Sequence, residues 1–425
     1  MTTEPKIHRR QLLAAGVVGT SSSLSGCLSN DQTISTYADS SDWRFAYHDT
    51  GHSGYNPAAS GITDEPQIRF ERSIADGSDR YRYDLPPTPI VVDGVLYIGG
   101  DGVHAIDTDD GRTLWHVDED TSYHGSAMVG GTVYITSRSG TRNDGTSFVH
   151  AVDADSGQEQ WQTEITADNR PGPYPPIVAG STVYGHAESG VVQALSSDDG
   201  ATEWTVDGWG SLNISPIVTF DTETLYHYEE RIKARESGQS GIRTLLRQPP
   251  AVIWEQSPPG STSGWLTVRN ETLYAPGEAS AHRYNDGQMS AHGTDGSEKW
   301  TYDIGARSSP PAIAGESLYI VTLRADGRIG HNYRYEPTVV ALDATDGTER
   351  WTQTLEDPRP TDAQPIVTDD VVYIGNVGKE VHAFDTESGE QRWSYTLDSP
   401  VRSLATVGND LYVVTAAGML YALSS

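Results

Sequence analysis

The chain has 425 residues, enough for one large all-β domain or for two to three ordinary domains. Its formal net charge is −30, from 59 acidic residues against 29 basic ones. Such an acidic surface excludes nucleic acid as a partner, because no basic face is available to displace counterions from phosphates. The same charge destabilises a compact state by self-repulsion unless salt screens it, and at ~1 M salt the Debye length is roughly 3 Å. We therefore expect a protein from a high-salt environment; an acidic secreted protein from an ordinary environment is the alternative.

Residues 1–27 have the pattern of an export signal. Arg9 and Arg10 precede an apolar stretch that is too short to span a bilayer, and the paired arginines resemble a twin-arginine signal. The sequence LSGC at 24–27 resembles a lipobox, whose cysteine becomes lipidated. Cys27 is the only cysteine, so an intrachain disulfide is excluded. We expect lipidated Cys27 to hold the protein at the extracellular face of the membrane; a cleaved signal with a coincidental cysteine is the alternative.

Residues 28–41 are rich in Ser, Thr and Asp and have little to bury, which predicts a flexible tether. Residues 42–425 are expected to form one domain built from a single repeat. The segment AIDTDDGRTLW at 105–115 recurs at 151–161, 194–204, 341–351 and 383–393, and a weaker copy ends at Trp300. In all six copies a glycine precedes a tryptophan by four residues. Trp254 closes a seventh, degenerate unit that has Pro250 at the glycine position.

Each unit contains four short β-type runs separated by turn residues, the pattern of a propeller blade. Three further runs follow Trp393, and residues 67–74 are a lone strand with no blade of its own. If this strand completes the last blade, eight blades close into a ring and no sheet edge stays unpaired. We therefore predict an all-β, eight-bladed propeller of four-stranded antiparallel blades, with seven blades and an appended hairpin as the alternative.

The acidic DTDDG sequence inside the repeat looks at first like a cation-binding loop. An EF-hand loop needs acidic or amide side chains at positions one, three and five and a Glu at twelve, whereas here the fifth and twelfth positions are Gly111 and Asp118. We expect the aspartate to accept backbone N–H bonds, the glycine to adopt positive φ, and the tryptophan to pack between blades. No metal site is predicted. These structural positions are Asp107, Gly111, Trp115, Asp153, Gly157, Trp161, Gly200, Trp204, Trp254, Gly296, Trp300, Asp343, Gly347, Trp351, Asp385, Gly389 and Trp393.

Three histidines, at 104, 150 and 382, occupy the same position of the repeat. They fall in different blades and cannot converge on one metal ion, so we expect them to be strand-surface residues.

The repeats resemble the PQQ-like, or quinoprotein-type, β-propeller family, whose blades carry the motif A-x-D-x-x-x-G-x-x-x-W. Residues 42–57 resemble the segment W-x-x-x-x-x-D-x-x-x-T/S-G that often leads such propellers. The size and the lipoprotein design are similar to those of the propeller lipoprotein of bacterial outer-membrane assembly, while the composition resembles that of haloarchaeal proteins. The resemblance implies a non-catalytic, membrane-anchored scaffold that binds a protein or a ligand.

Two other functions stay open. The resemblance also admits a quinoprotein dehydrogenase that uses PQQ with Ca²⁺, and a propeller that senses a solute in its central channel. Dehydrogenases of this type often carry an adjacent-cysteine disulfide and a Glu/Asn/Asp set, and neither can be assigned here. No hydrolase, zinc-protease or phosphate-loop motif is present. We therefore expect no catalytic residue, no cofactor and a monomer, and leave enzymatic activity open.

The segments that differ most from the repeat are predicted to lie on one face of the propeller. Insertions at 137–147, 228–250 and 323–337 are expected between the second and third strands of their blades, and all three carry arginine. They are predicted to form a binding face with residues from the blade-to-blade loops; ordinary solvated loops are the alternative. The candidates are Tyr123, His124, Arg170, Tyr174, Trp209, Asn213, Arg231, Arg235, Arg243, Trp265, Arg307, Arg328, Gln364 and Arg402.

Overall fold

A computed structural model describes residues 40–75, 87–118, 122–140, 145–165, 172–187, 190–206, 219–220, 224–228, 231–236, 248–257, 261–262, 265–279, 286–329, 332–356 and 363–425. Arg9, Arg10, Cys27 and the predicted tether up to residue 39 lie outside these ranges. The chain divides into two compact units, residues 1–33 and 34–425, and all the described strands belong to the second. No helix in the described ranges has the length and apolar character needed to cross a membrane.

The strands follow one another in sets of four along the chain. Blade one is β2 (Ile90–Val92), β3 (Val95–Gly99), β4 (Gly102–Asp107) and β5 (Thr113–Asp118). Blade two is β6 (Ser122–Val129), β7 (Thr132–Ser139), β8 (Thr146–Asp153) and β9 (Glu159–Ile165). Blade three is β10 (Ile177–Ala179), β11 (Thr182–His186), β12 (Val192–Ser196) and β13 (Thr202–Val206). Blade four is β14 (Thr219–Phe220), β15 (Thr224–Tyr228), β16 (Ile232–Glu236) and β17 (Val252–Gln256).

In the next two sets the first strand is split into two pieces. Blade five is β18 (Ser261–Thr262), β19 (Thr267–Arg269), β20 (Thr272–Glu278), β21 (Gly287–Gly293) and β22 (Glu298–Gly305). Blade six is β23 (Arg307–Ser308), β24 (Ala312–Ala314), β25 (Ser317–Ile329), β26 (Asn332–Asp343) and β27 (Glu349–Thr354). Blade seven is β28 (Ile366–Val367), β29 (Val371–Gly375), β30 (Glu380–Asp385) and β31 (Gln391–Thr396). The last set is β32 (Val401–Val407), β33 (Asp410–Thr415), β34 (Met419–Ser424) and β1 (Gln67–Ser73).

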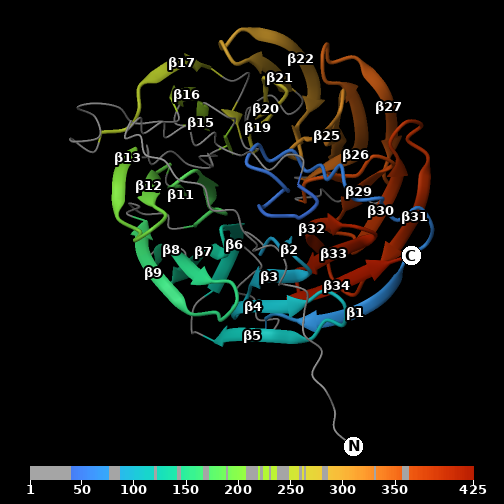
Figure 1. Cartoon of the computed structure of the whole chain (residues 1–425). Helices are drawn as coiled ribbons and strands as arrows, with labels where there is room; N and C mark the ends of the chain where they lie inside the picture. Colours follow the sequence, from blue (N-terminus) through green and yellow to red (C-terminus); the bar gives the residue numbers. More distant parts are fainter. Residues whose placement is uncertain are drawn as a thin grey trace, which may run out of the picture. The chain divides into compact units, whose positions relative to one another are not determined.

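These antiparallel sets lie around a ring, which confirms the predicted all-β propeller (Figure 1). Six sets are separate four-stranded sheets, and blades five and six form one ten-stranded sheet that is joined at a single pair, Gly305 and Leu323. Counted with that sheet as two blades, the described strands make eight sets. β1 pairs with β34 from Gln67–Ser424 to Ser73–Met419, so the lone N-terminal strand completes the last sheet as expected.

The repeat motif joins five pairs of successive blades. An ideal Cβ atom on Gly157 would lie 2.8 Å from Cε3 of Trp115, because the tryptophan of one blade packs on the glycine of the following blade. Gly157 has φ 73°, as predicted for this turn. The indole nitrogen of Trp115 donates to the carbonyl of Ala154 at 2.9 Å, and Asp107 accepts the backbone N–H of Asp109 at 2.9 Å. The same packing joins Trp161 to Gly200, Trp254 to Gly296, Trp300 to Gly347 and Trp351 to Gly389.

The two faces of the ring carry different connections. The turn face holds the links from first to second and from third to fourth strands, including every Asp–Gly turn. The insertion face holds the links from second to third strands and between blades. The structure corrects one predicted insertion: β16 ends at Glu236 and β17 begins at Val252, so most of the predicted insertion 228–250 falls between the third and fourth strands and not between the second and third. In the other units a glycine marks the turn between the third and fourth strands, but here Pro250 stands at that position, so the sequence did not identify the connection.

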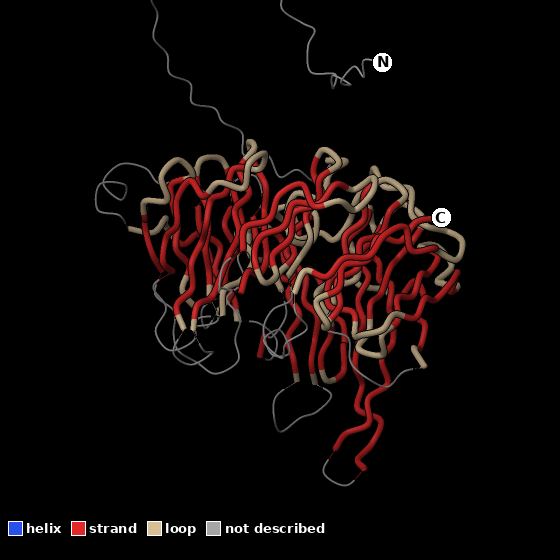
Figure 2. The backbone as a smooth tube through the Cα atoms, turned by 90° about the horizontal axis from the view of Figure 1, so that it is seen from below, coloured by secondary structure: helices blue, strands red, loops and turns tan. Residues whose placement is uncertain are grey.

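A long hairpin projects from the insertion face. β25 and β26 have 13 and 12 residues, whereas the other second and third strands have five to eight. Pairing continues to Ile329 and Asn332, so the predicted loop insertion 323–337 is an extended β-hairpin. At about 3.3 Å per residue, it reaches roughly 15 Å beyond its neighbours (Figure 2).

Residues 43–62, the central segment, cross the middle of the ring (Figure 1). The segment binds the first strands of several blades through backbone hydrogen bonds: Trp43 pairs with Val91, and the carbonyl of Gly51 accepts from Val268. Further along, the carbonyl of Gly54 accepts from Val367 at 2.8 Å. The leading segment of the sequence therefore fastens distant blades together at the centre of the propeller.

Candidate functional site

The predicted binding-face residues do not form one open surface. Arg170, Trp209, Asn213 and Arg243 lie outside the described residues. Six others are buried, which corrects the expectation of an exposed cluster: Tyr123, His124, Tyr174, Arg235, Trp265 and Gln364.

Arg235 shows why an arginine in a predicted insertion can be structural. It lies in β16 and is only 8% exposed. Its Nε donates to Nε2 of His227 at 2.8 Å, and its Nη1 donates to the carbonyl of Pro250 at 2.8 Å. Burial and the charge of Arg235 hold the pKa of His227 well below its usual value. Arg235 therefore ties Pro250, just before β17, to β16.

Four of the predicted residues remain at or near the surface of the insertion face. Arg231 is exposed in the turn between β15 and β16 and lies 3.2 Å from Glu255. Arg307 and Arg402 are half-buried at the starts of their blades. Arg328 lies in β25 near the tip of the projecting hairpin. Of these four residues, only Arg328 lies on the projecting hairpin.

The centre of the propeller is filled by aromatic side chains. The rings of Tyr47 and His52, from the central segment, lie 4.9 and 5.4 Å from the ring of Trp265. The ring of Tyr174 lies 5.5 Å from Trp265 and stacks on that of His186 at 5.1 Å. Burial lowers the pKa of His52 to about 3. This cluster packs the central segment against Trp265 and Tyr174.

A buried carboxylate lies beside the aromatic cluster. Asp49 accepts hydrogen bonds from the backbone N–H and the hydroxyl of Ser53, and Arg269 Nη1 lies 3.3 Å from its Oδ2. Burial alone would raise the pKa of Asp49, but the neighbouring His48 ring and the bonds from Ser53 hold it below its usual value. Its hydrogen-bonding capacity is used within the central segment and by Arg269.

The described residues do not fit PQQ with Ca²⁺. Calcium takes six to eight oxygen ligands, and in the described part of the chain no three His, Cys, Asp or Glu side chains are grouped to hold a metal ion. The central carboxylate, Asp49, is already satisfied by Ser53 and Arg269. We derive no chemical step through a quinone.

A serine, a histidine and a glutamate of blade two form a chain of hydrogen bonds that resembles a catalytic triad. Ser137 Oγ lies 2.6 Å from His150 Nε2, and His150 Nδ1 lies 2.8 Å from Glu159 Oε2. However, Ser137 is 0% exposed, so no substrate reaches its hydroxyl. The array ties β7, β8 and β9 together. His150 and His382 are 1% and 8% exposed, which corrects the expectation of strand-surface histidines.

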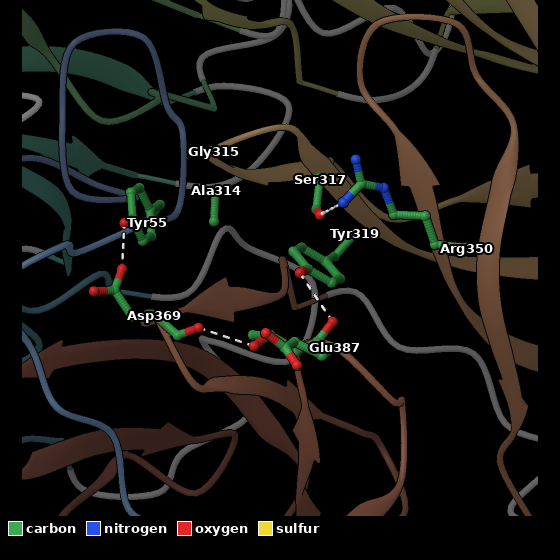
Figure 3. Close-up of a pocket in the computed structure, with 9 residues that line it drawn as sticks. Tyr55, Ala314, Gly315, Ser317, Tyr319, Arg350, Asp369 and Glu387 are labelled. Carbon is green, nitrogen blue, oxygen red and sulfur yellow. Dashed lines mark hydrogen bonds between the residues drawn. The ribbon is translucent and has the colours of Figure 1, made fainter.

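A polar cavity of about 390 Å³ lies on the turn face, between blades six and seven (Figure 3). Its walls come from the first-to-second turns of both blades, the third-to-fourth turn of blade seven and the central segment. The lining residues are Tyr55, Ala314, Gly315, Ser317, Tyr319, Arg350, Asp369, Thr386 and Glu387.

The polar groups of this pocket are held in place by hydrogen bonds. Arg350 donates from Nη1 to Ser317 Oγ at 2.9 Å and from Nη2 to Asp343 Oδ2 at 2.6 Å. On the opposite wall, Tyr55 donates its hydroxyl to Asp369 Oδ1 at 2.5 Å. Tyr319 donates to the backbone carbonyl of Thr386 at 3.3 Å, and burial raises its pKa, so its hydroxyl is protonated. The pocket thus presents a fixed guanidinium, two carboxylates and two tyrosine rings.

Sequence reasoning missed this pocket. Its residues are spread from Tyr55 to Glu387, and most occupy ordinary repeat positions in turns that were interpreted only as structural. The one available signal was Tyr55, which follows the conserved-looking leader segment without a role in the repeat.

The repeat, the closed ring and the interblade tryptophans define a PQQ-like β-propeller. The family model described as "Outer membrane protein assembly factor BamB" matches residues 99–331 and 335–425. The chain therefore belongs to this family. A comparison with curated proteins found no significant match.

Solved structures with the same fold include BamB and several dehydrogenases. BamB from Moraxella catarrhalis is 17% identical with a TM-score of 0.62, covering 85% of this chain and all of its own. Quinohemoprotein alcohol dehydrogenase from Comamonas testosteroni is 14% identical with a TM-score of 0.68, covering 92% of this chain and 81% of its own. A europium-containing methanol dehydrogenase is 13% identical with a TM-score of 0.62, covering 90% of this chain and 98% of its own. At these identities the likeness shows the fold alone.

Proposed function

We propose that this protein is a non-catalytic, membrane-anchored propeller that binds a partner protein at the extracellular face of the membrane. The observation that carries the proposal is the β25–β26 hairpin, which extends beyond the other strands of the insertion face (Figure 2). A projecting hairpin exposes backbone and side chains to a partner without disturbing the ring. Membership of the BamB family agrees with such a role.

The composition of the hairpin supports a protein partner. Residues 323–337 carry three arginines and two tyrosines against one aspartate and one glutamate, a net charge of +1 in a chain of −30. Tyr and Arg are the residue types that most often dominate binding at protein interfaces. In high salt these charges act only at contact distance, so an acidic partner would pair directly with the hairpin arginines.

The anchoring part of the proposal rests on the export signal and on Cys27. A lipid on Cys27 and the short segment that follows would keep the propeller close to the membrane, where membrane-bound partners are concentrated.

The test is recovery of partners from the organism's own membranes in high salt. One variant replaces residues 326–334 by Asn-Gly, which forms a two-residue turn between the paired residues Ala325 and Tyr335. A second changes Arg328 and Arg334 to Ser and keeps the hairpin length. Arg112→Ser, an exposed arginine of the turn face, is the matched control. Partner proteins recovered with the full chain and the control, but not with the two hairpin variants, support the proposal; equal recovery with all four contradicts it.

A further inference from the structure

We propose that the polar pocket between blades six and seven binds a carbohydrate unit that carries no acidic group. This site lies on the turn face, away from the hairpin, and does not depend on the proposed protein-binding function. A volume of about 390 Å³ is at the lower end of the about 300–1,000 Å³ of small-molecule pockets.

The charges around the pocket select against an anionic ligand. Arg350 lines the same cavity as Asp369 and Glu387 (Figure 3). Its guanidinium is already paired with Asp343 at 2.6 Å and lies 3.8 Å from Glu316, so an anion gains little from Arg350 and is repelled by the two carboxylates of the lining. A ligand without an acidic group avoids this repulsion and forms charge-assisted hydrogen bonds with those carboxylates.

The hydrogen-bonding groups are complementary to hydroxyls, which both donate and accept. Among the described residues, the Glu387 carboxylate has no hydrogen-bond or ion-pair partner, and Asp369 uses one carboxylate oxygen for Tyr55. These oxygens accept from ligand hydroxyls, while Arg350 is a donor. The tyrosine rings of the lining offer flat apolar surfaces for the C–H face of a sugar ring.

The pocket is preorganised by contacts from the central segment and from the repeat itself. The central segment brings Tyr55 beside Val367 and under the Arg269 guanidinium, which lies 5.0 Å from the ring centroid. Tyr55 in turn fixes the Asp369 carboxylate. On the other wall, Ser317 and Asp343 hold Arg350. Groups that are fixed before binding lose little entropy when the ligand arrives.

The experiment is saturation-transfer NMR on the full chain with glucose and maltose as neutral probes. Glucosamine and glucuronate, at a pH where one is cationic and the other anionic, test the charge argument on the same ring. The lowest salt concentration that preserves the native circular dichroism spectrum is used, because screening would weaken charge discrimination.

Two variants test the location. Glu387→Gln removes one acceptor carboxylate and is expected to weaken binding of the neutral sugar about tenfold. Ala314→Trp fills the cavity and is expected to abolish binding. Asp155→Asn is the matched control, because Asp155 is exposed at the equivalent turn position of blade two. Melting curves establish that each variant is folded.

Binding of glucose or maltose that exceeds that of glucuronate and does not exceed that of glucosamine, is lost in folded Ala314→Trp and is kept in Asp155→Asn supports the proposal. Absence of neutral-sugar binding to the folded wild-type protein overturns it. A preference for glucuronate overturns the charge argument, and binding retained by folded Ala314→Trp overturns the location.

Discussion

Replacing Gly347 by alanine tests the contact that joins blade five to blade six. Gly347 has φ 75°, and an added Cβ would lie 2.7 Å from Cε3 of Trp300. A left-handed conformation costs an alanine about 1–2 kcal/mol, and overpacking costs about 1–3 kcal/mol more. We therefore expect Gly347→Ala to lower the free energy of unfolding by about 2–5 kcal/mol.

Gly180→Ala is the matched control for this prediction. Gly180 also has positive φ, at 61°, but no heavy atom lies within 4 Å of its added Cβ. It should lose only the backbone contribution, about 1–2 kcal/mol. The assay is urea unfolding in high salt, followed by tryptophan fluorescence. Equal losses in the two variants would refute the packing of tryptophan on glycine as the reason for the motif.

Three further predictions concern the centre and the anchor. Arg269→Met leaves the buried Asp49 carboxylate without its ion-pair partner and should lower the free energy of unfolding by about 2–3 kcal/mol in the same urea assay; no loss would contradict the pairing. Burial lowers the pKa of His52 to about 3, whereas in the unfolded chain it is about 6.5. Between pH 7 and pH 5 the unfolded chain therefore takes up a proton at this histidine and the folded chain does not. The free energy of unfolding should fall by about 2 kcal/mol over that range. His52→Asn should remove that part of the pH dependence, and an unchanged pH profile would contradict it. Cys27→Ser should release the protein into the medium, measured by immunoblot of cells and supernatant, whereas retention at the membrane would contradict lipid anchoring.

The fold was predictable because its stabilising contacts recur. A glycine four residues before a tryptophan marks the same turn in each copy, and in five of the six copies this glycine packs on the tryptophan of the preceding blade, so the pattern is visible without any coordinates. The closing strand was predictable too, since β1 and three C-terminal strands each lacked a complete blade. In blade four the motif glycine is replaced by Pro250. The repeat therefore did not show which two strands the insertion 228–250 connects, and its predicted position between the second and third strands was wrong.

The sites were less predictable because they depend on contacts between distant residues. The central segment pairs with strands up to several hundred residues away, and its buried Asp49 and His52 look in sequence like an ordinary polar loop. The pocket combines Tyr55 with Arg350 and Glu387, which no spacing rule connects. The number of arginines in a segment does not show which of them are buried, as Arg235 is, and which are exposed, as Arg231 is.

Partner recovery through the β25–β26 hairpin tests the central claim most directly. A photo-crosslinking residue is placed at Ile329, near the hairpin tip, and in a control at Asp155 on the turn face, and both proteins are irradiated on membranes in high salt. We predict one defined crosslinked partner at Ile329, absent at Asp155 and competed away by the uncrosslinked full chain but not by the variant that lacks residues 326–334. No crosslink at Ile329, or competition by the shortened variant as effective as by the full chain, would contradict the account.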